Sequence, residues 1–444
     1  MEPFTRKALL ARGAAAAGSA LAGAAFPSKV LAAPAWPLAS AYTAEVPLRW
    51  FDLALELVRT TPGFSPPVAS RAFGYAGVAL YEALTPGMPG RRSLAGQLND
   101  LGRPPGPSDR SYHWPTVANR ALASILRSLS PTAVAESAAA IDELERRLAS
   151  SAQAVLPLGI YRRSVARGQE VAAHIFDWST TDGGHEAFSR NFPPYTPPSG
   201  PALWVPTPPG FLPALQPYWG ANRPFVLSTG ASCAPVPPPT YSEVIGSRFY
   251  AEANECYEAT RNLTADQEAI ARFWSDDPGQ TPTPPGHSIS ILSQVARMLG
   301  LSLAGAAEAY AKVGIAVGDA FIACWNTKYR DNLLRPVTYI RNLIDTAWTP
   351  LLVTPPFPEY TSGHSVQSGA AAQVLTDLFG DVAFVDRTHE RRGLPARAFR
   401  SFHEAAAEAA VSRLYGGIHF RAAIERGLEQ GACVGRHVSA VTTG

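Results

Sequence analysis

Several common features are scarce in this chain of 444 residues, and each absence argues against a class of protein. The four cysteines form no Cys-x-x-Cys pair, which argues against a structural zinc site and against thioredoxin-like chemistry. No apolar stretch after the N-terminus is both long enough and free enough of charge to span a bilayer, so the sequence predicts no transmembrane anchor. The formal net charge is +2, and nothing therefore favours a nucleic-acid partner.

Alternating runs of β-branched residues, which are typical of strands, are nearly absent as well. Runs rich in Ala, Leu, Glu and Arg dominate instead, with apolar residues three and four positions apart. They predict helices at residues 45–60, 66–84, 113–128, 131–150, 159–178, 241–260, 265–275, 287–299, 303–334, 364–379, 396–415 and 419–439. The predicted fold is therefore all-α, with two halves that each resemble a four-helix bundle.

Proline, by contrast, is abundant: the chain has 41, about twice the usual usage. Between about residues 180 and 240 the helical pattern stops, and the sequence becomes rich in Pro, Gly, Trp and Phe. Such a composition cannot form a helix, yet it is too aromatic for a free linker. We expect an ordered belt that packs across the helices. It would close an N-terminal half at 36–240 and precede a C-terminal half at 241–444.

The N-terminus has the pattern of an export signal. It has a basic start with Arg6 and Lys7, a small and weakly apolar core, and small-residue cleavage options near Ala32 or Ala35. The strict Arg-Arg pair of a twin-arginine signal is missing, so the ordinary secretory route stays open, and a plain N-terminal tail is the alternative. We expect residues 1–35 to act as the signal and the mature protein to be exported to the envelope or the outside of a bacterial cell.

The predicted export also bears on the four cysteines, Cys233, Cys256, Cys324 and Cys433. An exported protein meets an oxidising environment, so Cys233 and Cys256 are candidates for a disulfide. Buried free thiols are the alternative.

The segment around Lys328 is the first of three that carry side chains suited to an anion. Lys328 and Arg335 are seven residues apart, which is about two helical turns and predicts side chains near one helical face. Pro336 should end or kink that helix. A solvated basic face is the plainer interpretation.

The other two segments lie further along the chain. Ser362 stands at a predicted helix N-cap, Gly363 lets the backbone approach an anion, and His364 in the first turn can exchange protons with it. A helix through Arg413 should stop at Gly416-Gly417, so that Arg413 and His419 can turn toward one point. A simple cap and a structural histidine are the plainer interpretations. Together the three segments supply many donors, two histidines and few acids, an inventory that suits an oxyanion with several negative oxygens.

The order and spacing of these residues resemble the vanadium-dependent haloperoxidases and the wider type 2 phosphatidic acid phosphatase superfamily. That pattern is Lys, six residues, Arg-Pro; then Pro-Ser-Gly-His; then Ser-Arg, five residues, His. Here it runs from Lys328 to Arg335-Pro336, through Thr361-Ser362-Gly363-His364, to Ser412-Arg413 and His419, with Thr361 in place of the proline. The segments WVPTPPGFLPALQPYWG and FWSDDPGQTPTPPGH also look like bacterial members of the haloperoxidase branch.

The resemblance implies a vanadate cofactor, with no haem and no flavin. His419 would be the covalent ligand of vanadium, and His364 the acid–base residue. The groups that hold the vanadate oxygens would be Lys328, Arg335, Arg413, Ser362 and Gly363. Hydrogen peroxide and a halide would be substrates, Lys328 would polarise the bound peroxide, and the hypohalous acid formed would halogenate a small organic molecule.

Two alternatives use the same residues differently. One is an acid phosphatase in which His419 attacks phosphorus and His364 protonates the leaving oxygen. The other is an anion-binding scaffold without turnover, for which a proton shuttle at His364 would be unnecessary. The resemblance leaves the halide, the organic substrate and the oligomeric state open.

Further positions are implied by the same resemblance. Trp325 and Phe357 resemble the aromatics that line the pocket in the chloride-oxidising branch, with ordinary core packing as the alternative. Asp277 is the candidate acid beside Arg413, and Asp276 is nearly as good. The phosphatases often carry an Asp four residues after the last histidine, where this chain has Ala423. The partner that orients His419 would then be a backbone carbonyl or another acid.

Overall fold

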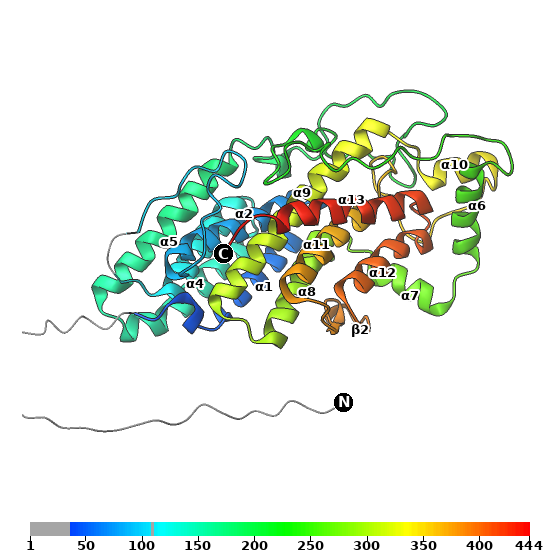
Figure 1. Ribbon diagram of the computed structural model, residues 1–444. Helices are drawn as coiled ribbons and strands as arrows, with labels where there is room; N and C mark the ends of the chain where they lie inside the picture. The colour runs from blue at the N-terminus through cyan, green and yellow to red at the C-terminus, as the bar shows by residue number, and fades with distance from the viewer. Residues whose placement is uncertain (1–35, 108–110) are drawn as a thin grey trace, which may run out of the picture. The chain divides into compact units, whose positions relative to one another are not determined.

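The computed structural model of the protein describes residues 36–107 and 111–444, which are mainly helical (Figure 1). The helices are α1 (Glu45–Thr60), α2 (Pro66–Leu84), α3 (Trp114–Leu129), α4 (Ala135–Val155), α5 (Leu158–Ser179), α6 (Arg248–Arg261), α7 (Ala265–Phe273), α8 (Thr283–Leu299), α9 (Leu303–Asp331), α10 (Pro336–Leu343), α11 (Gly363–Phe379), α12 (Phe402–Tyr415) and α13 (Arg421–Ser439). Two short strands, β1 (Phe384–Asp386) and β2 (Arg397–Phe399), pair antiparallel between α11 and α12. The predicted all-α class is confirmed, with this hairpin as a small addition.

Helix α9 runs through the centre of the fold. Every residue from 306 to 325 is buried, as expected for a helix surrounded by others on all faces. It packs against α2 on one side and against α11 and α13 on another. Glycines allow the close approach of α2: a Cβ at Gly77 would clash with the carbonyl of Tyr310, and one at Gly314 would lie 2.7 Å from the carbonyl oxygen of Phe73.

A glycine likewise allows α11 and α13 to approach closely. A Cβ at Gly431 of α13 would clash with the carbonyl of Val366 on α11. At the start of α11, the backbone N–H of Ser362 donates to the carbonyl of Ala423 on α13 at 3.0 Å. The N-terminus of α11 is thereby fixed beside the turn that joins α12 to α13.

The predicted belt is confirmed as an ordered segment without α-helix between α5 and α6. In Figure 1 it is the long green stretch that runs along one side of the helices. Asp319 of α9 is fully buried and accepts the backbone N–H groups of Phe225, Val226 and Leu227 at 2.6, 2.8 and 3.1 Å. Another anchor is the N–H of Leu215, which donates to the carbonyl of Pro356 at 2.8 Å. The belt is therefore tied both to the central helix and to the loop before α11.

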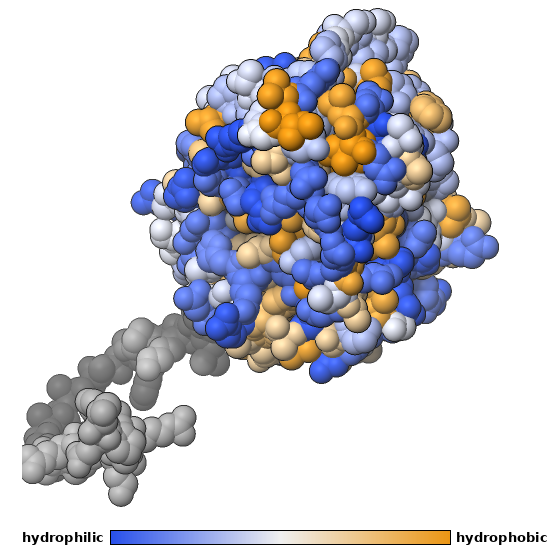
Figure 2. All heavy atoms as spheres, turned by 90° about the vertical axis from the view of Figure 1, so that its right-hand side faces the viewer, coloured by the Kyte–Doolittle hydropathy of each residue, from blue (hydrophilic) through white to orange (hydrophobic). Residues whose placement is uncertain are grey.

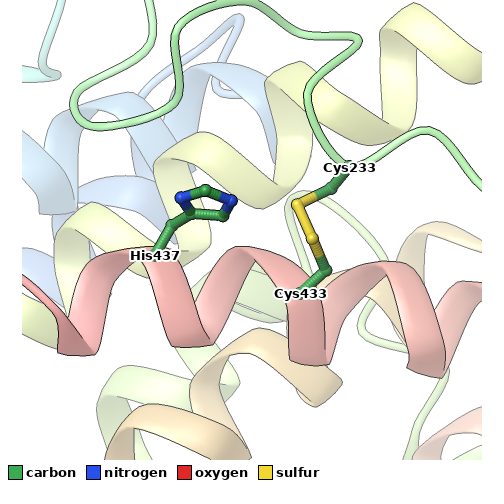
Figure 3. A group of neighbouring side chains, drawn as sticks. All are labelled: Cys233, Cys433 and His437. Atoms are coloured by element: carbon green, nitrogen blue, oxygen red, sulfur yellow. A yellow bond between two sulfur atoms is a disulfide. The ribbon is translucent and has the colours of Figure 1, made fainter.

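A disulfide joins the belt to the last helix. It connects Cys233 with Cys433 of α13, 200 residues later, with their Cα atoms 5.9 Å apart (Figure 3). The predicted pair of Cys233 with Cys256 is wrong, because Cys256 on α6 faces a separate apolar cluster that includes Phe249. The alternative of buried free thiols holds for Cys256 and Cys324.

Helix boundaries depart from the predictions at a few points. The predicted helix 303–334 ends at Asp331, because Asn332 adopts a left-handed conformation with φ 45°. The backbone N–H of Asn332 donates to the carbonyl of Lys328 and so caps the helix. Lys328 and Arg335 therefore do not share a helical face, and Arg335 is instead the N-cap of α10. The predicted helices 241–260 and 396–415 begin later, at Arg248 and Phe402.

Residues Trp36–Gly444 form one compact unit, and the boundary near residue 240 stays a prediction. The predicted export signal, 1–35, lies outside the described residues. Of the helices in the described residues, none combines the length and the apolar character that a bilayer span requires. Figure 2 shows the end of the molecule that carries α6, α7 and α10, where hydrophilic and hydrophobic side chains are interspersed.

Candidate active site

The N-terminus of α11 carries the Ser-Gly-His triplet. Ser362 is the N-cap, as predicted, and its Oγ accepts the backbone N–H of Ser365 at 3.3 Å. Gly363 is the first residue of the helix, and His364 lies in the first turn. The free N–H groups and the dipole of a helix N-terminus favour an anion at this position.

The side chain of His364 is largely enclosed, at 15% exposure. Its Nε2 has no hydrogen-bond partner among the described residues and lies 3.9 Å from Oδ2 of Asp276. Burial, and then the charge of Arg413, hold the pKa of His364 well below its usual range. His364 is therefore a neutral imidazole, able to accept a proton.

Lys328 and Arg335 are fully buried and are held by carbonyl oxygens of the loop before α11. Lys328 Nζ donates to the carbonyls of Pro358 and Glu359 at 2.9 and 3.0 Å. Arg335 donates from Nε to the carbonyl of Phe357 at 2.7 Å. Burial lowers the pKa of Lys328 to about 7 and that of Arg335 to about 10. The two cations meet through this loop and not, as predicted, along one helix.

Arg413 of α12 is the third buried cation. It donates to Oγ of Ser412 at 2.9 Å and to the carbonyl of Ala271 at 3.2 Å, and burial lowers its pKa to about 10. The acid predicted beside it, Asp277, is exposed, whereas Asp276 is buried and exerts the larger electrostatic effect on Arg413. Both aspartates therefore lie at the site, and the alternative, Asp276, is the buried acid that faces His364. The described residues place no carboxylate within ion-pair distance of Arg413.

His419 follows the left-handed Gly417, as predicted, and precedes α13. Its Nδ1 lies 2.9 Å from Oε1 of Glu359, an oxygen that also accepts the backbone N–H of Phe420 at 2.8 Å. Its Nε2 lies 3.2 Å from a terminal nitrogen of Arg335. Burial and the neighbouring cations hold the pKa of His419 well below its usual range, so the ring is neutral.

Phe357 lies between two of these cations. The ring centroid is 4.9 Å from Lys328 Nζ and 4.8 Å from the guanidinium carbon of Arg335, which is a cation–π arrangement on both counts. Trp325 packs against Phe357 with centroids 4.9 Å apart, and its Nε1 donates to the carbonyl of Leu215 in the belt at 3.2 Å. The aromatic pair therefore joins the cationic site to the belt.

One cavity of about 410 Å³ brings the three sequence segments together. The predicted residues that line it are Trp325, Asp277, Phe357, Gly363, His364, Arg413 and His419, and the alternative acid, Asp276, lines it as well. Lys328, Arg335 and Ser362 are buried and do not line it. The rest of the wall is largely apolar and comes from belt residues 207–212 and the loop 352–356. The arrangement is an anion site within an apolar cavity.

Sequence reasoning missed one acid of this site and underrated two other contributors. Glu359, which binds His419, lies in a proline-rich loop where no pattern signals a buried acid; the alanine at 423 was the only hint that such an acid is needed. Asp276 was ranked below Asp277. The belt was expected to pack across the helices, and its part in the cavity wall was not foreseen.

Comparisons with known proteins agree with this geometry. A family model described as the VCPO second helical-bundle domain matches residues 308–443. A bacterial vanadium-dependent iodoperoxidase is 41% identical and superposes with a TM-score of 0.82, over 89% of this chain and 96% of that one. This chain belongs to the vanadium-dependent haloperoxidase family.

More distant members of the family share the fold of this haloperoxidase-family chain. A bacterial vanadium-dependent chloroperoxidase in its holo form is 18% identical with a TM-score of 0.66, over 86% of this chain and 92% of that one. The apo form of a bacterial vanadium-dependent chloroperoxidase is also 18% identical, with a TM-score of 0.62 over 86% of this chain and 94% of that one. A search of curated protein sequences finds no match.

Proposed function

We propose that this protein is a vanadate-dependent haloperoxidase that uses hydrogen peroxide to oxidise a halide to a hypohalous-acid equivalent, which halogenates an organic molecule. The observation that carries the proposal is the neutral His419 beside three buried cations. Membership of the family, with an iodoperoxidase at 41% identity, supports the reaction class.

Among the described residues, no carboxylate forms an ion pair with any of the three cations. Lys328, Arg335 and Arg413 donate to carbonyl, hydroxyl and imidazole groups, and their pKa values are all lowered by burial. Buried charges are costly unless an opposite charge compensates them. An oxyanion with several negative charges satisfies this demand, and the Ser362 hydroxyl and the N-terminus of α11 add neutral donors.

The hydrogen bonds of His419 fix its tautomer. Arg335 beside Nε2 can only donate, so Nδ1 carries the ring proton and donates to Oε1 of Glu359, which also accepts from Phe420. Nε2 therefore keeps its lone pair, to which Arg335 donates. A neutral imidazole oriented by a hydrogen bond on its other nitrogen is a suitable metal ligand. The residues present thus fit vanadate, with His419 as its ligand.

Bound vanadate would supply a Lewis acid that activates peroxide without a change in its own oxidation state. Lys328, Arg335 and Arg413 stabilise the negative charge on the oxygens from fixed positions. Nε2 of His364, which has no hydrogen-bond partner in the part of the chain that the structure describes, takes up the proton that the peroxide releases, and Asp276 compensates the resulting imidazolium.

We expect the cavity wall to determine which organic acceptor and which halide the protein uses. The apolar residues of the belt suit an uncharged organic acceptor, and Phe357 beside two cations is where the choice of halide is made. We also propose export from the cell, which the Cys233–Cys433 disulfide supports because such bonds persist in oxidising compartments.

The test uses the purified protein loaded with orthovanadate. Halogenation of a phenol-type dye is followed with peroxide and, in turn, iodide, bromide and chloride. We expect vanadate-dependent turnover that is lost in His419→Ala together with vanadate binding. Hydrolysis of a phosphate ester without vanadate, alongside no halogenation with it, would overturn the proposal in favour of a phosphatase.

A further inference from the structure

A buried cluster of two acids and two histidines lies directly behind His364. Its members come from three parts of the chain: Asp276 after α7, His287 on α8, and the hairpin, where Asp386 ends β1 and His389 follows it. All four are at most 2% exposed. No step of the proposed reaction uses His287, Asp386 or His389.

Both ring nitrogens of His287 face carboxylates. Nδ1 lies 2.9 Å from Oδ2 of Asp276, and Nε2 lies 2.7 Å from Oδ2 of Asp386. A neutral imidazole has one N–H, so it would present a lone pair to one of these oxygens, which is repulsive. His287 is therefore an imidazolium, and the ring of Trp274 stacks on it with centroids 4.4 Å apart. Burial lowers its pKa, but the two aspartates outweigh burial and raise it to about 10.

The protonation of His287 also bears on whether the cluster can bind a metal ion. Asp276, His287 and His389 lie close enough together to hold a metal ion. A metal ligand needs a free lone pair, however, and both nitrogens of an imidazolium carry protons. A doubly protonated His287 and a metal ion ligated by His287 therefore exclude one another.

Asp276 is the link between the cluster and the active site. Its Oδ1 accepts from His389 at 3.1 Å, while Oδ2 faces both His287 and, at 3.9 Å, Nε2 of His364. The other charged and titratable groups that act on His364 are Arg413 and His287 itself. Two carboxylates with one imidazolium leave one net negative charge on the cluster, and Asp276 is the carboxylate that faces His364.

We propose that His287 is a positioning residue: held as an imidazolium between Asp276 and Asp386, it keeps Asp276 ionised and oriented toward His364. A buried carboxylate without a cation would take up a proton or turn away, because desolvation penalises its charge. Asp276 could then no longer stabilise His364 after that residue has accepted a proton. Asp386 in turn is fixed by Thr388, whose backbone N–H and hydroxyl donate to its Oδ1 at 2.9 and 2.6 Å. This inference rests on the proposed role of His364.

The first test needs no turnover. Side-chain ¹⁵N NMR of histidine-labelled protein, assigned with His287→Gln, reports which ring nitrogens carry protons. We expect both nitrogens of His287 to be protonated at about pH 8, where an unperturbed histidine is neutral. A single protonated nitrogen on His287 at that pH would overturn the inference, whatever reaction the protein catalyses.

The second test uses halide oxidation by the vanadate-loaded protein. His287→Gln should lower kcat on the order of 10-fold or more, as loss of a supporting partner typically does, while vanadate affinity changes little. His403→Gln, the same change at an exposed histidine of α12, is the matched control and should leave kcat unaltered. Asp386→Asn keeps the shape of the cluster but removes one carboxylate, and it should also lower kcat. Unchanged kcat in both cluster variants would overturn the inference.

A double variant separates positioning from a general loss of structure. If His287 acts through His364, His287→Gln should cost little further kcat in a His364→Ala background, because the two effects are not additive. A full additional loss would show a merely structural role and would overturn the inference. If the wild-type protein oxidises no halide, the proposed function fails, and the NMR result still decides the state of His287.

Discussion

Glu359 and His419 form a neutral hydrogen-bonded pair, with Oε1 and Nδ1 2.9 Å apart. Burial raises the pKa of Glu359 to about 8, and Oε2, which has no partner among the described residues, is the oxygen free to carry the proton. Oε1 then acts as a carbonyl-like acceptor for His419 and for the backbone N–H of Phe420. The pair orients the proposed vanadium ligand without adding a negative charge beside it.

This assignment predicts different outcomes for two substitutions at one position. Glu359→Gln has the shape of the protonated acid and should change vanadate affinity by less than about threefold below pH 8. Glu359→Leu leaves two buried N–H groups unpaired, and affinity should fall about 10- to 100-fold. Equilibrium dialysis with vanadate measures both. An equally large loss in the glutamine variant would mean that Glu359 works as a carboxylate.

The lowered pKa of Lys328 predicts how the affinity for an anion depends on pH. Its pKa is lowered to about 7 in the anion-free site, and a bound anion favours the charged ammonium and raises that pKa. Below about pH 7 binding needs no proton; above it one proton is taken up, so affinity should fall up to roughly tenfold per pH unit. Sulfate is a suitable probe because it does not titrate in this range, and calorimetry in two buffers counts the protons.

Glu359 supplies the control for that experiment. Its raised pKa of about 8 would add a second proton at higher pH, and the Glu359→Gln variant removes this contribution. The remaining uptake should disappear in Lys328→Met, which binds sulfate more weakly. Sulfate affinity that does not vary as the pH passes through about 7 would contradict the assignment to Lys328.

The sequence was most informative where a property is local. Ser362 as an N-cap and the stop of α12 at Gly416-Gly417 follow from capping chemistry within a few residues, and both are found. The early end of α9 was missed, because only the left-handed Asn332 distinguishes it from a helix that continues to Pro336. Asp276 and Asp277 are neighbours of identical type, and only the fold decides which is buried.

Features that depend on distant contacts had no local signal. The three anion-binding segments were recognised one by one, but the glycine-mediated contact of α11 with α13 and the carbonyls of loop 357–359 bring them together. Glu359 is an ordinary acid in a loop until packing buries it. Cys233 forms its disulfide with Cys433, and not with Cys256, which is nearer in the sequence, because α13 passes beneath the belt.

The disulfide should matter for stability more than for the anion site. It closes a loop of 200 residues, so its removal increases the entropy of the unfolded chain, and Cys233→Ser with Cys433→Ser should cost about 2–5 kcal/mol of unfolding free energy. Thermal unfolding with and without reductant checks this: the wild type should lose stability on reduction and the double variant should not respond. Equal stability of the two proteins under oxidising conditions would contradict the prediction.

The belt wall predicts where an organic acceptor binds. Phe211 lines the cavity with 63% of its surface exposed, area that an apolar molecule would cover. Phe211→Ser should therefore raise KM for an aromatic acceptor about 3- to 10-fold, because an aromatic contact of roughly 1 kcal/mol is lost. Oxidation of iodide alone, followed as triiodide, should keep its kcat. Phe192→Ser is the matched control, since Phe192 is 45% exposed in the belt but does not line the cavity. If the two variants raise KM equally, or if neither does, the acceptor reacts outside the cavity with released hypohalous acid.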